Sequence, residues 1–190
     1  KHWMTAEELL LKDQIGKGFV ETDPPTGIIR NVEEFAPSYG VIVRYPFGIP
    51  ITLIREMAED DIVLTIVNSA NEKNTVLNQY VSSSVDTSHC RFLIAPSNSY
   101  WTRDYGPWYI QYADSLFGIV DFPYNRPRPA DDEIPKKVAQ MQGIEWFGMN
   151  VTHTGGNYMT TGIGHSSSTT LVWDENTDQT HAQIAQKLKD

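Results

Sequence analysis

One polar stretch of the sequence combines side chains that could bind and position a cation. Residues 92–112 read FLIAPSNSYWTRDYGPWYIQY, in which two apolar runs flank a turn-rich centre that holds Trp101, Arg103 and Asp104. Loops at strand ends commonly carry function. A carboxylate accepts two parallel N–H donors from a guanidinium, and an indole face attracts the same flat cation. Asp104 near Trp101 therefore predicts a guanidinium-type site, whereas composition alone favours a structural turn among buried tryptophans.

A proline-stiffened segment carries two arginines. Residues 123–129, PYNRPRP, place Arg126 and Arg128 two positions apart. Alternate residues of an extended segment point to the same side. Two guanidinium groups that face one direction could clamp a carboxylate or a phosphate, and a solvated basic loop explains the pattern equally well.

A glycine pair follows a histidine in residues 153–159, HTGGNYM. Glycines let a backbone approach a ligand closely, although the pattern alone favours a tight turn with His153 exposed. His153 and His165 have no acidic or cysteine partners at the spacing of metal ligands, so we predict no metal site. The sequence also lacks a dinucleotide fingerprint, a phosphate loop and a Gly-x-Ser-x-Gly elbow.

Composition indicates one globular domain of ordinary size. The 190 residues are 40% hydrophobic and 21% charged, and the formal net charge is −9. This charge argues against nucleic-acid binding and permits a cationic substrate. No apolar run approaches the roughly 20 residues of a membrane helix. The single cysteine, Cys90, opens an apolar run, so we predict a buried thiol and not a nucleophile.

Apolar runs and helical patterns alternate along the chain, which predicts an α/β fold. The strand that begins at Phe92 is expected at the centre of its sheet. Strands are predicted at residues 39–45, 61–68, 92–95, 108–112, 116–122, 144–149 and 169–173. Helices are predicted at residues 5–14, with a Thr5–Glu8 capping box, and at 51–60, 71–82, 131–142 and 180–190.

Three of these motifs together resemble the Porphyromonas-type peptidylarginine deiminases, close relatives of the agmatine deiminases in the guanidine-modifying pentein superfamily. The motifs are SYWTRDYGPW, YNRPRP followed by DDEIPKK, and HTGGNYM, and the similarity runs from about Glu33 to Asp190. The resemblance implies a pentein, a fivefold pseudosymmetric α/β propeller of ββαβ-type blades, which is incomplete in this chain. Residues 1–190 would be the N-terminal portion of one deiminase catalytic domain, with a helix and loop at 1–30 and propeller blades at 31–190.

The resemblance also implies roles for individual residues. Asp104 matches the carboxylate that grips the substrate guanidinium, and Trp101 matches an aromatic wall of the same pocket. Arg126 and Arg128 match the pair that holds the α-carboxylate of a C-terminal arginine. Gly156 matches a position that lines the substrate cleft. The implied reaction is hydrolysis of peptidyl-arginine to citrulline and ammonia, which needs no organic cofactor.

The sequence departs from the family pattern at the catalytic groups. In the family a cysteine thiolate attacks the guanidinium carbon, and a His-x-Asp pair supplies the acid and base and a second guanidinium contact. This chain has no His-x-Asp, and Cys90 lies in the wrong place. The resemblance therefore implies a complementary C-terminal chain that carries both, and a chain inactive by itself. Thr161 also stands where relatives often carry aspartate.

Three functions remain open on these grounds. The chain could belong to a peptidylarginine deiminase-like enzyme, to a small-amine hydrolase of the agmatine deiminase kind, or to a non-catalytic arginine-binding protein. The expected partners are peptides or proteins with arginine, without nucleic acid or a membrane span. Relatives of this type are exported, so a secreted or cell-envelope location is expected.

Overall fold

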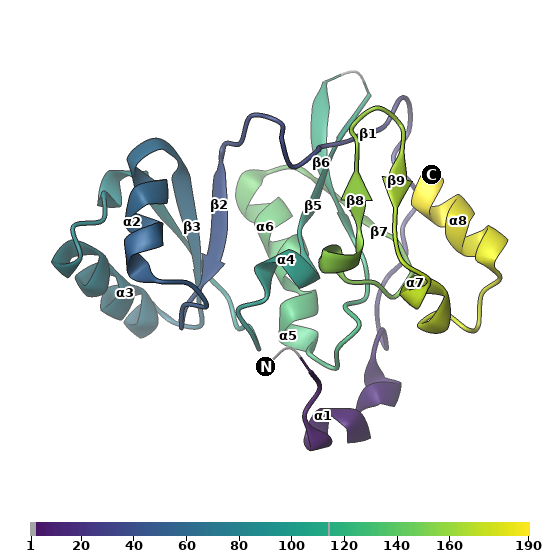
Figure 1. Ribbon diagram of the computed structural model, residues 1–190, viewed down its shortest axis with the longest axis horizontal. Coiled ribbons are helices and arrows are strands. Elements are labelled where there is room, and N and C mark those ends of the chain that lie inside the picture. The colour runs from purple at the N-terminus through teal and green to yellow at the C-terminus, as the bar shows by residue number, and fades with distance from the viewer. Residues whose placement is uncertain (1–2, 114) are drawn as a thin grey trace. The chain divides into compact units, whose positions relative to one another are not determined.

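A computed structural model describes residues 3–113 and 115–190 (Figure 1). The chain divides into two compact units, one formed by residues 35–102 and the other by residues 1–34 together with 103–190. Each unit has a sheet of its own. The predicted mixed α/β class is confirmed.

The unit of residues 35–102 is a parallel sheet with two crossover helices. Its strands lie in the order β2 (Gly40–Arg44), β3 (Ile62–Val67) and β4 (Cys90–Ile94). Helices α2 (Ile51–Asp60) and α3 (Ala70–Ser82) connect them, and a short 3-10 helix, η2 (Thr87–His89), precedes β4. The expectation that the strand near Phe92 is central was wrong: β3 is central, because both neighbouring strands pair with it in parallel.

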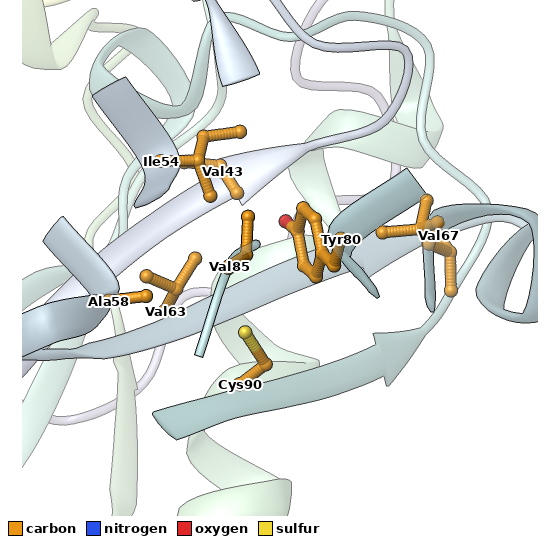
Figure 2. Packing of buried hydrophobic residues seen from close by; sticks show 9 residues of the cluster. Val43, Ile54, Ala58, Val63, Val67, Tyr80, Val85 and Cys90 are labelled. Atoms are coloured by element: carbon orange, nitrogen blue, oxygen red, sulfur yellow. The ribbon is translucent and has the colours of Figure 1, made fainter. Parts of the chain in front are cut away.

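Figure 2 shows the core of this unit, to which strands and helices contribute together. Tyr80 of α3 is fully buried, and its hydroxyl shares a 2.7 Å hydrogen bond with Thr65 of β3. Cys90 is 7% exposed, which confirms the predicted buried thiol. Burial raises the pKa of the Cys90 thiol, and the nearby Asp86 adds to the shift. The labelled members of the cluster are Val43, Ile54, Ala58, Val63, Val67, Tyr80, Val85 and Cys90.

The other unit contains a mixed four-stranded sheet. Its strands lie in the order β1 (Arg30–Asn31), β5 (Trp108–Tyr112), β6 (Leu116–Asp121) and β7 (Glu145–Gly148). Strands β5 and β6 are antiparallel, whereas β6 and β7 are parallel and are joined through α5 (Pro129–Asp132) and α6 (Ile134–Gln142). The run β5–β6–α6–β7 is therefore a ββαβ arrangement. One helix had been predicted for residues 131–142, and Pro135 occupies the first turn of α6, where proline is tolerated.

Short elements complete this unit. Thr5 and Glu8 form the predicted capping box, but the helix is shorter than expected. The bounds are α1 (Ala6–Leu10), η1 (Lys12–Gln14), α4 (Thr102–Tyr105, which begins at the end of the other unit), η3 (Gly155–Asn157), β8 (Met159–Thr160), β9 (Ser166–Ser167), α7 (Leu171–Asp174) and α8 (His181–Lys189). No helix within residues 3–113 and 115–190 combines the length and apolarity that a bilayer crossing requires.

The strand predicted at residues 169–173 was wrong, because this segment forms the helix α7. The Thr170 carbonyl accepts the N–H groups of Trp173 and Asp174 at 2.9 and 3.3 Å. Val172 points into a small core with Val151 and Ile184. An apolar run of this length does not separate a strand from one turn of helix, and packing decided the outcome.

Asp121, at the end of β6, is a buried acid. It is 2% exposed, and its carboxyl oxygens accept hydrogen bonds from the Phe122 N–H at 2.8 Å and the Trp146 indole at 2.9 Å. Burial raises the pKa of Asp121 to about 8, and the acids Asp132 and Glu133 contribute in the same direction. The side chain is therefore neutral in the folded protein below that pH.

This burial predicts a pH-dependent loss of stability. Because folding raises the pKa of Asp121, its contribution to stability is fully present below the unfolded value of about 4 and is lost as the pH rises through about 8. We expect Asp121→Asn to flatten the decline in the free energy of unfolding between pH 5 and 9, by up to about 1.4 kcal/mol per pH unit. Urea denaturation across this range measures it. The exposed Asp178→Asn is the control, and equal slopes in Asp121→Asn and wild type would contradict the assignment.

Candidate functional site

The Asp104 carboxylate lies against the glycine turn of η3. The Thr154 hydroxyl donates to Asp104 Oδ1 at 3.2 Å. A β-carbon on Gly156 would lie 2.7 Å from the same oxygen, and a β-carbon on Gly155 would lie 2.1 Å from the carbonyl oxygen of Arg103. Both distances are shorter than a real β-carbon tolerates. At Gly155 the obstacle is backbone, so this position requires glycine, whereas at Gly156 it is the movable end of the Asp104 side chain. The structure thus brings together Asp104 and Gly156, two residues that the sequence had singled out.

Arg103 holds the other side of the same turn. Its guanidinium donates to the carbonyl of Tyr158 at 3.0 Å and forms an ion pair with Glu34. Tyr158 in turn accepts a 2.8 Å hydrogen bond from the Asn31 side chain at its hydroxyl. Arg103 therefore holds the turn in position through Tyr158, while the neighbouring Asp104 contacts the turn directly.

His153 is fully buried, so the expected exposed histidine was wrong. Its ring meets Trp108 edge-on, with 5.2 Å between ring centroids. Its Nδ1 lies 2.8 Å from the Thr154 N–H and 2.9 Å from the Thr154 carbonyl, and its Nε2 faces the Ser168 hydroxyl at 3.2 Å. Burial lowers the pKa of His153. The residue is thus a neutral part of the core beneath the glycine turn.

The PYNRPRP segment runs beside residues 151–154 and then turns. The Asn125 N–H donates to the His153 carbonyl at 3.0 Å, and the Arg128 N–H donates to the Arg126 carbonyl at 2.7 Å. The second bond closes a three-residue turn around Pro127. The extended backbone that we had expected for this segment was therefore wrong, and the argument that alternate residues share a side does not apply.

The two arginines have different local partners. Arg126 is half-buried, and its Nη1 donates to the carbonyl and to the side-chain oxygen of Asn125, both at 2.8 Å. The Arg128 side chain is only 6% exposed. Its Nε donates to Oε1 of Glu8 at 2.7 Å, and its Nη2 lies 3.4 Å from Oε2. Burial pulls the pKa of Arg128 down, but Glu8, Tyr124 and Asp131 together outweigh it and the net shift is upward.

Tyr124 links the carboxylate and the arginines electrostatically. It is 2% exposed and packs edge-on against Tyr105, with 6.1 Å between ring centroids. Burial raises the pKa of Tyr124, the charge of Asp104 raises it further, and Arg128 and Arg126 lower it. All three candidate groups therefore act on one buried phenol. The sequence had not singled out Tyr124, although it lies inside the PYNRPRP motif.

Trp101 belongs to the unit of residues 35–102 and is described within it. Its half-buried indole is tilted against Tyr100, with 5.0 Å between ring centroids. The Tyr100 ring lies so close to Gly48 that a β-carbon there would approach it to 2.5 Å. The role of Trp101 as an aromatic wall stays a prediction. Thr161, in the hairpin of the other unit, donates its hydroxyl to the His165 carbonyl at 3.2 Å.

A groove of about 990 Å³ lies elsewhere in the unit of residues 1–34 and 103–190. It is bordered by residues 21–31, the β8–β9 hairpin and α8, and it includes none of Asp104, Arg126, Arg128 and Gly156. The residues that the sequence motifs identify therefore do not line this groove. Within residues 3–113 and 115–190, no group of three or more histidine, cysteine or acidic side chains is arranged to hold a metal ion.

Comparison with known proteins identifies the family. Residues 49–190 match the Porphyromonas-type peptidyl-arginine deiminases, and the chain belongs to that family. Members of this family and the structural neighbours are hydrolytic, guanidine-modifying deiminases.

Solved structures of agmatine deiminases show the same fold. An Enterococcus faecalis agmatine deiminase is 19% identical with a TM-score of 0.72, covering 85% of this chain and 50% of that one. A C. jejuni agmatine deiminase is 19% identical with a TM-score of 0.67, covering 85% and 52%. A Porphyromonas gingivalis protein assigned as an arginine deiminase is 17% identical with a TM-score of 0.71, covering 85% and 54%. The chain thus spans about half the length of these proteins and forms part of a pentein.

The contact between Gly156 and Asp104 predicts a specific sensitivity. We expect Gly156→Ala to push the carboxylate aside, because the new methyl group would lie 2.7 Å from Oδ1. A side-chain end can rotate away, so the melting temperature should change little, while the affinity for a guanidinium ligand should fall about tenfold or more. Thermal unfolding and calorimetric titration with an arginine peptide measure the two effects. Unchanged affinity would place the guanidinium away from Asp104.

Proposed function

We propose that this chain supplies the substrate-gripping part of a deiminase that hydrolyses the side chain of a C-terminal peptidyl-arginine to citrulline and ammonia. The observation that carries the proposal is that the neighbouring residues His153 and Thr154 contact both motifs: the His153 carbonyl accepts the Asn125 N–H of the PYNRPRP segment at 3.0 Å, and the Thr154 hydroxyl donates to Asp104 at 3.2 Å. One negative group and two positive groups within a single unit match the charges of such a substrate.

The charge pattern favours this substrate over agmatine. A C-terminal arginine carries a cationic guanidinium at one end and an anionic α-carboxylate at the other, and carboxylate and guanidinium partners suit each in turn. Agmatine lacks the α-carboxylate, so it has no anionic group that Arg126 and Arg128 could bind. The agmatine alternative draws its support from the solved structures of similar fold, which are agmatine deiminases.

The proposed reaction is balanced by one water molecule and involves no change of oxidation state. A cysteine thiolate attacks the guanidinium carbon, a C–N bond breaks and ammonia leaves. Water then attacks the same carbon, the C–S bond breaks, and the ureido product and the thiolate are released. Asp104 would hold the remaining guanidinium N–H groups and stabilise the positive charge during attack.

The nucleophile comes, in this proposal, from a complementary part of the deiminase domain. Cys90 is the one cysteine of the chain, and burial raises its pKa, which disfavours the reactive thiolate. The solved relatives are about twice as long as the segment that matches this chain. A polypeptide that carries the cysteine and the His-x-Asp pair would therefore complete the site.

The carboxylate clamp predicts a split between substrates. We expect Arg126→Ala, in an enzyme completed by the second half, to lower kcat/KM for a benzoyl-glycyl-arginine free acid about 100-fold, because a charge-assisted bond is lost. Activity on the amidated peptide and on agmatine should change less than about threefold. Colorimetric citrulline assays measure both. Arg55→Ala, on α2 of the other unit, is the control, and equal losses on all substrates would refute the clamp.

Reconstitution separates an enzyme from an arginine-binding protein. The chain alone should bind the free-acid peptide and form no citrulline, and addition of a polypeptide with the His-x-Asp pair and the cysteine should start turnover. Intact-mass spectrometry of the purified sample confirms which polypeptides are present. Binding that persists without citrulline in the completed complex would support the non-catalytic alternative and refute the deiminase.

A further inference from the structure

The Arg128 guanidinium, proposed above to bind a substrate carboxylate, already binds a carboxylate of its own chain. Glu8, 120 residues earlier, presents Oε1 to Nε at 2.7 Å and Oε2 to Nη2 at 3.4 Å. Two oxygens meeting two nitrogens of one guanidinium is the arrangement that a free peptide C-terminus would adopt. Glu8 therefore stands in for the ligand at this residue.

The capping box orients Glu8 for this contact. Oε2 also accepts the Thr5 N–H at 2.8 Å, and the Glu8 N–H donates to the Thr5 hydroxyl at 3.2 Å. The hydrogen bond from Arg128 is the largest cause of a lowered pKa for Glu8. Arg128 thus favours the charged form of Glu8, and the Thr5 N–H fixes the orientation of the carboxylate.

Apart from Glu8, α1 has little buried contact with the unit, whereas the chain that follows it is hydrogen-bonded to the sheet. No residue of α1 is buried, and the leucines at positions 9, 10 and 11 are 58%, 82% and 50% exposed. Further on, Thr22 exchanges two 3.0 Å hydrogen bonds with Gly148 at the end of β7. The helix could therefore leave without disturbing the strand that anchors the segment. Figure 1 shows α1 beside α5, which follows Arg128 in the same unit.

We propose that α1 is an autoinhibitory segment whose Glu8 carboxylate occupies Arg128 and must be displaced before a carboxylate-bearing substrate is bound. This inference rests on the proposed clamp role of Arg128. A tethered carboxylate competes at an effective concentration on the order of millimolar. The apparent dissociation constant of the substrate rises by the reciprocal of the fraction of molecules in which the clamp is open. The competition affects only ligands with a carboxylate.

Glu8→Gln tests this competition. Glutamine keeps the capping box and removes the charge. We expect the 190-residue chain with Glu8→Gln to bind a benzoyl-glycyl-arginine free acid about tenfold more tightly than wild type, and to bind the amidated peptide equally. The control is Glu7→Gln, which makes the same charge change at an exposed position of the same helix and should match wild type. Thr5→Ala, which loosens the cap and keeps Glu8, should give a smaller gain, and calorimetric titration measures all four proteins.

The ratio of free-acid to amide affinity separates the two ways in which the inference can fail. If wild type and both α1 variants prefer the free acid to the same degree, the clamp exists and Glu8 is a structural anchor. If free acid and amide bind equally in every variant, the clamp itself is absent and the proposed substrate class fails with it. If Glu8→Gln does not fold, Thr5→Ala decides the question by the same ratio.

Discussion

The candidate site depends on a backbone contact at Gly155 that no residue with a side chain would permit. Gly155 lies against the carbonyl of Arg103, and the next residue, Gly156, lies against the carboxylate of Asp104. The helical turn α4 and the glycine turn η3 therefore fix each other. Thr154 then orients one oxygen of Asp104, and Arg103 ties the far side of the turn through Tyr158. A carboxylate held on a close-packed backbone loses little conformational entropy when it binds a cation, which is what a guanidinium grip requires.

Burial makes the charges of this unit interdependent. Tyr124 is buried and feels Asp104 and both arginines of the PYNRPRP motif, and Arg128 is buried and paired with Glu8. A buried guanidinium without a counter-charge is costly, and Arg128 has acids of its own chain to offset this cost: Glu8 pairs with it directly, and the charge of Asp131 also favours its ionised form.

The sequence predicted most elements where a pattern was local. The capping box at Thr5, the strand predicted at residues 61–68 and the helices predicted from residues 51 and 180 follow from residue spacing, and the structure has them. The errors lie where tertiary contacts decide. Residues 169–173 became a helical turn because Val172 fills a small core, and His153 became buried because the glycine turn and Trp108 enclose it.

The site shows the same division between local and distant information. Asp104, Gly156, Arg126 and Arg128 were identified by motif, and the expected partnership of the arginines rested on an extended backbone that the turn at Pro127 replaces. The contacts of His153 and Thr154 with Asn125 and Asp104 connect the two motifs, and no period in the sequence reveals these contacts or the burial of Tyr124. The partner of Arg128 lies 120 residues away, and its local pattern indicates only a helix cap.

One residue can thus satisfy a short-range rule and a long-range one at once. Glu8 closes the capping box with Oε2 and makes its shorter contact with Arg128 through Oε1, so the stability of the five-residue helix α1 and the occupancy of the proposed clamp are linked through a single carboxylate. A substrate that displaces Glu8 from Arg128 also removes an external support of α1 and leaves the cap intact. Because the helix has no buried side chain, the remaining cost of releasing it is small, and the exchange of one carboxylate for another becomes nearly balanced. When the free energies of the two carboxylate complexes of Arg128 are nearly equal, a weakly held helix such as α1 can control whether a substrate carboxylate binds there.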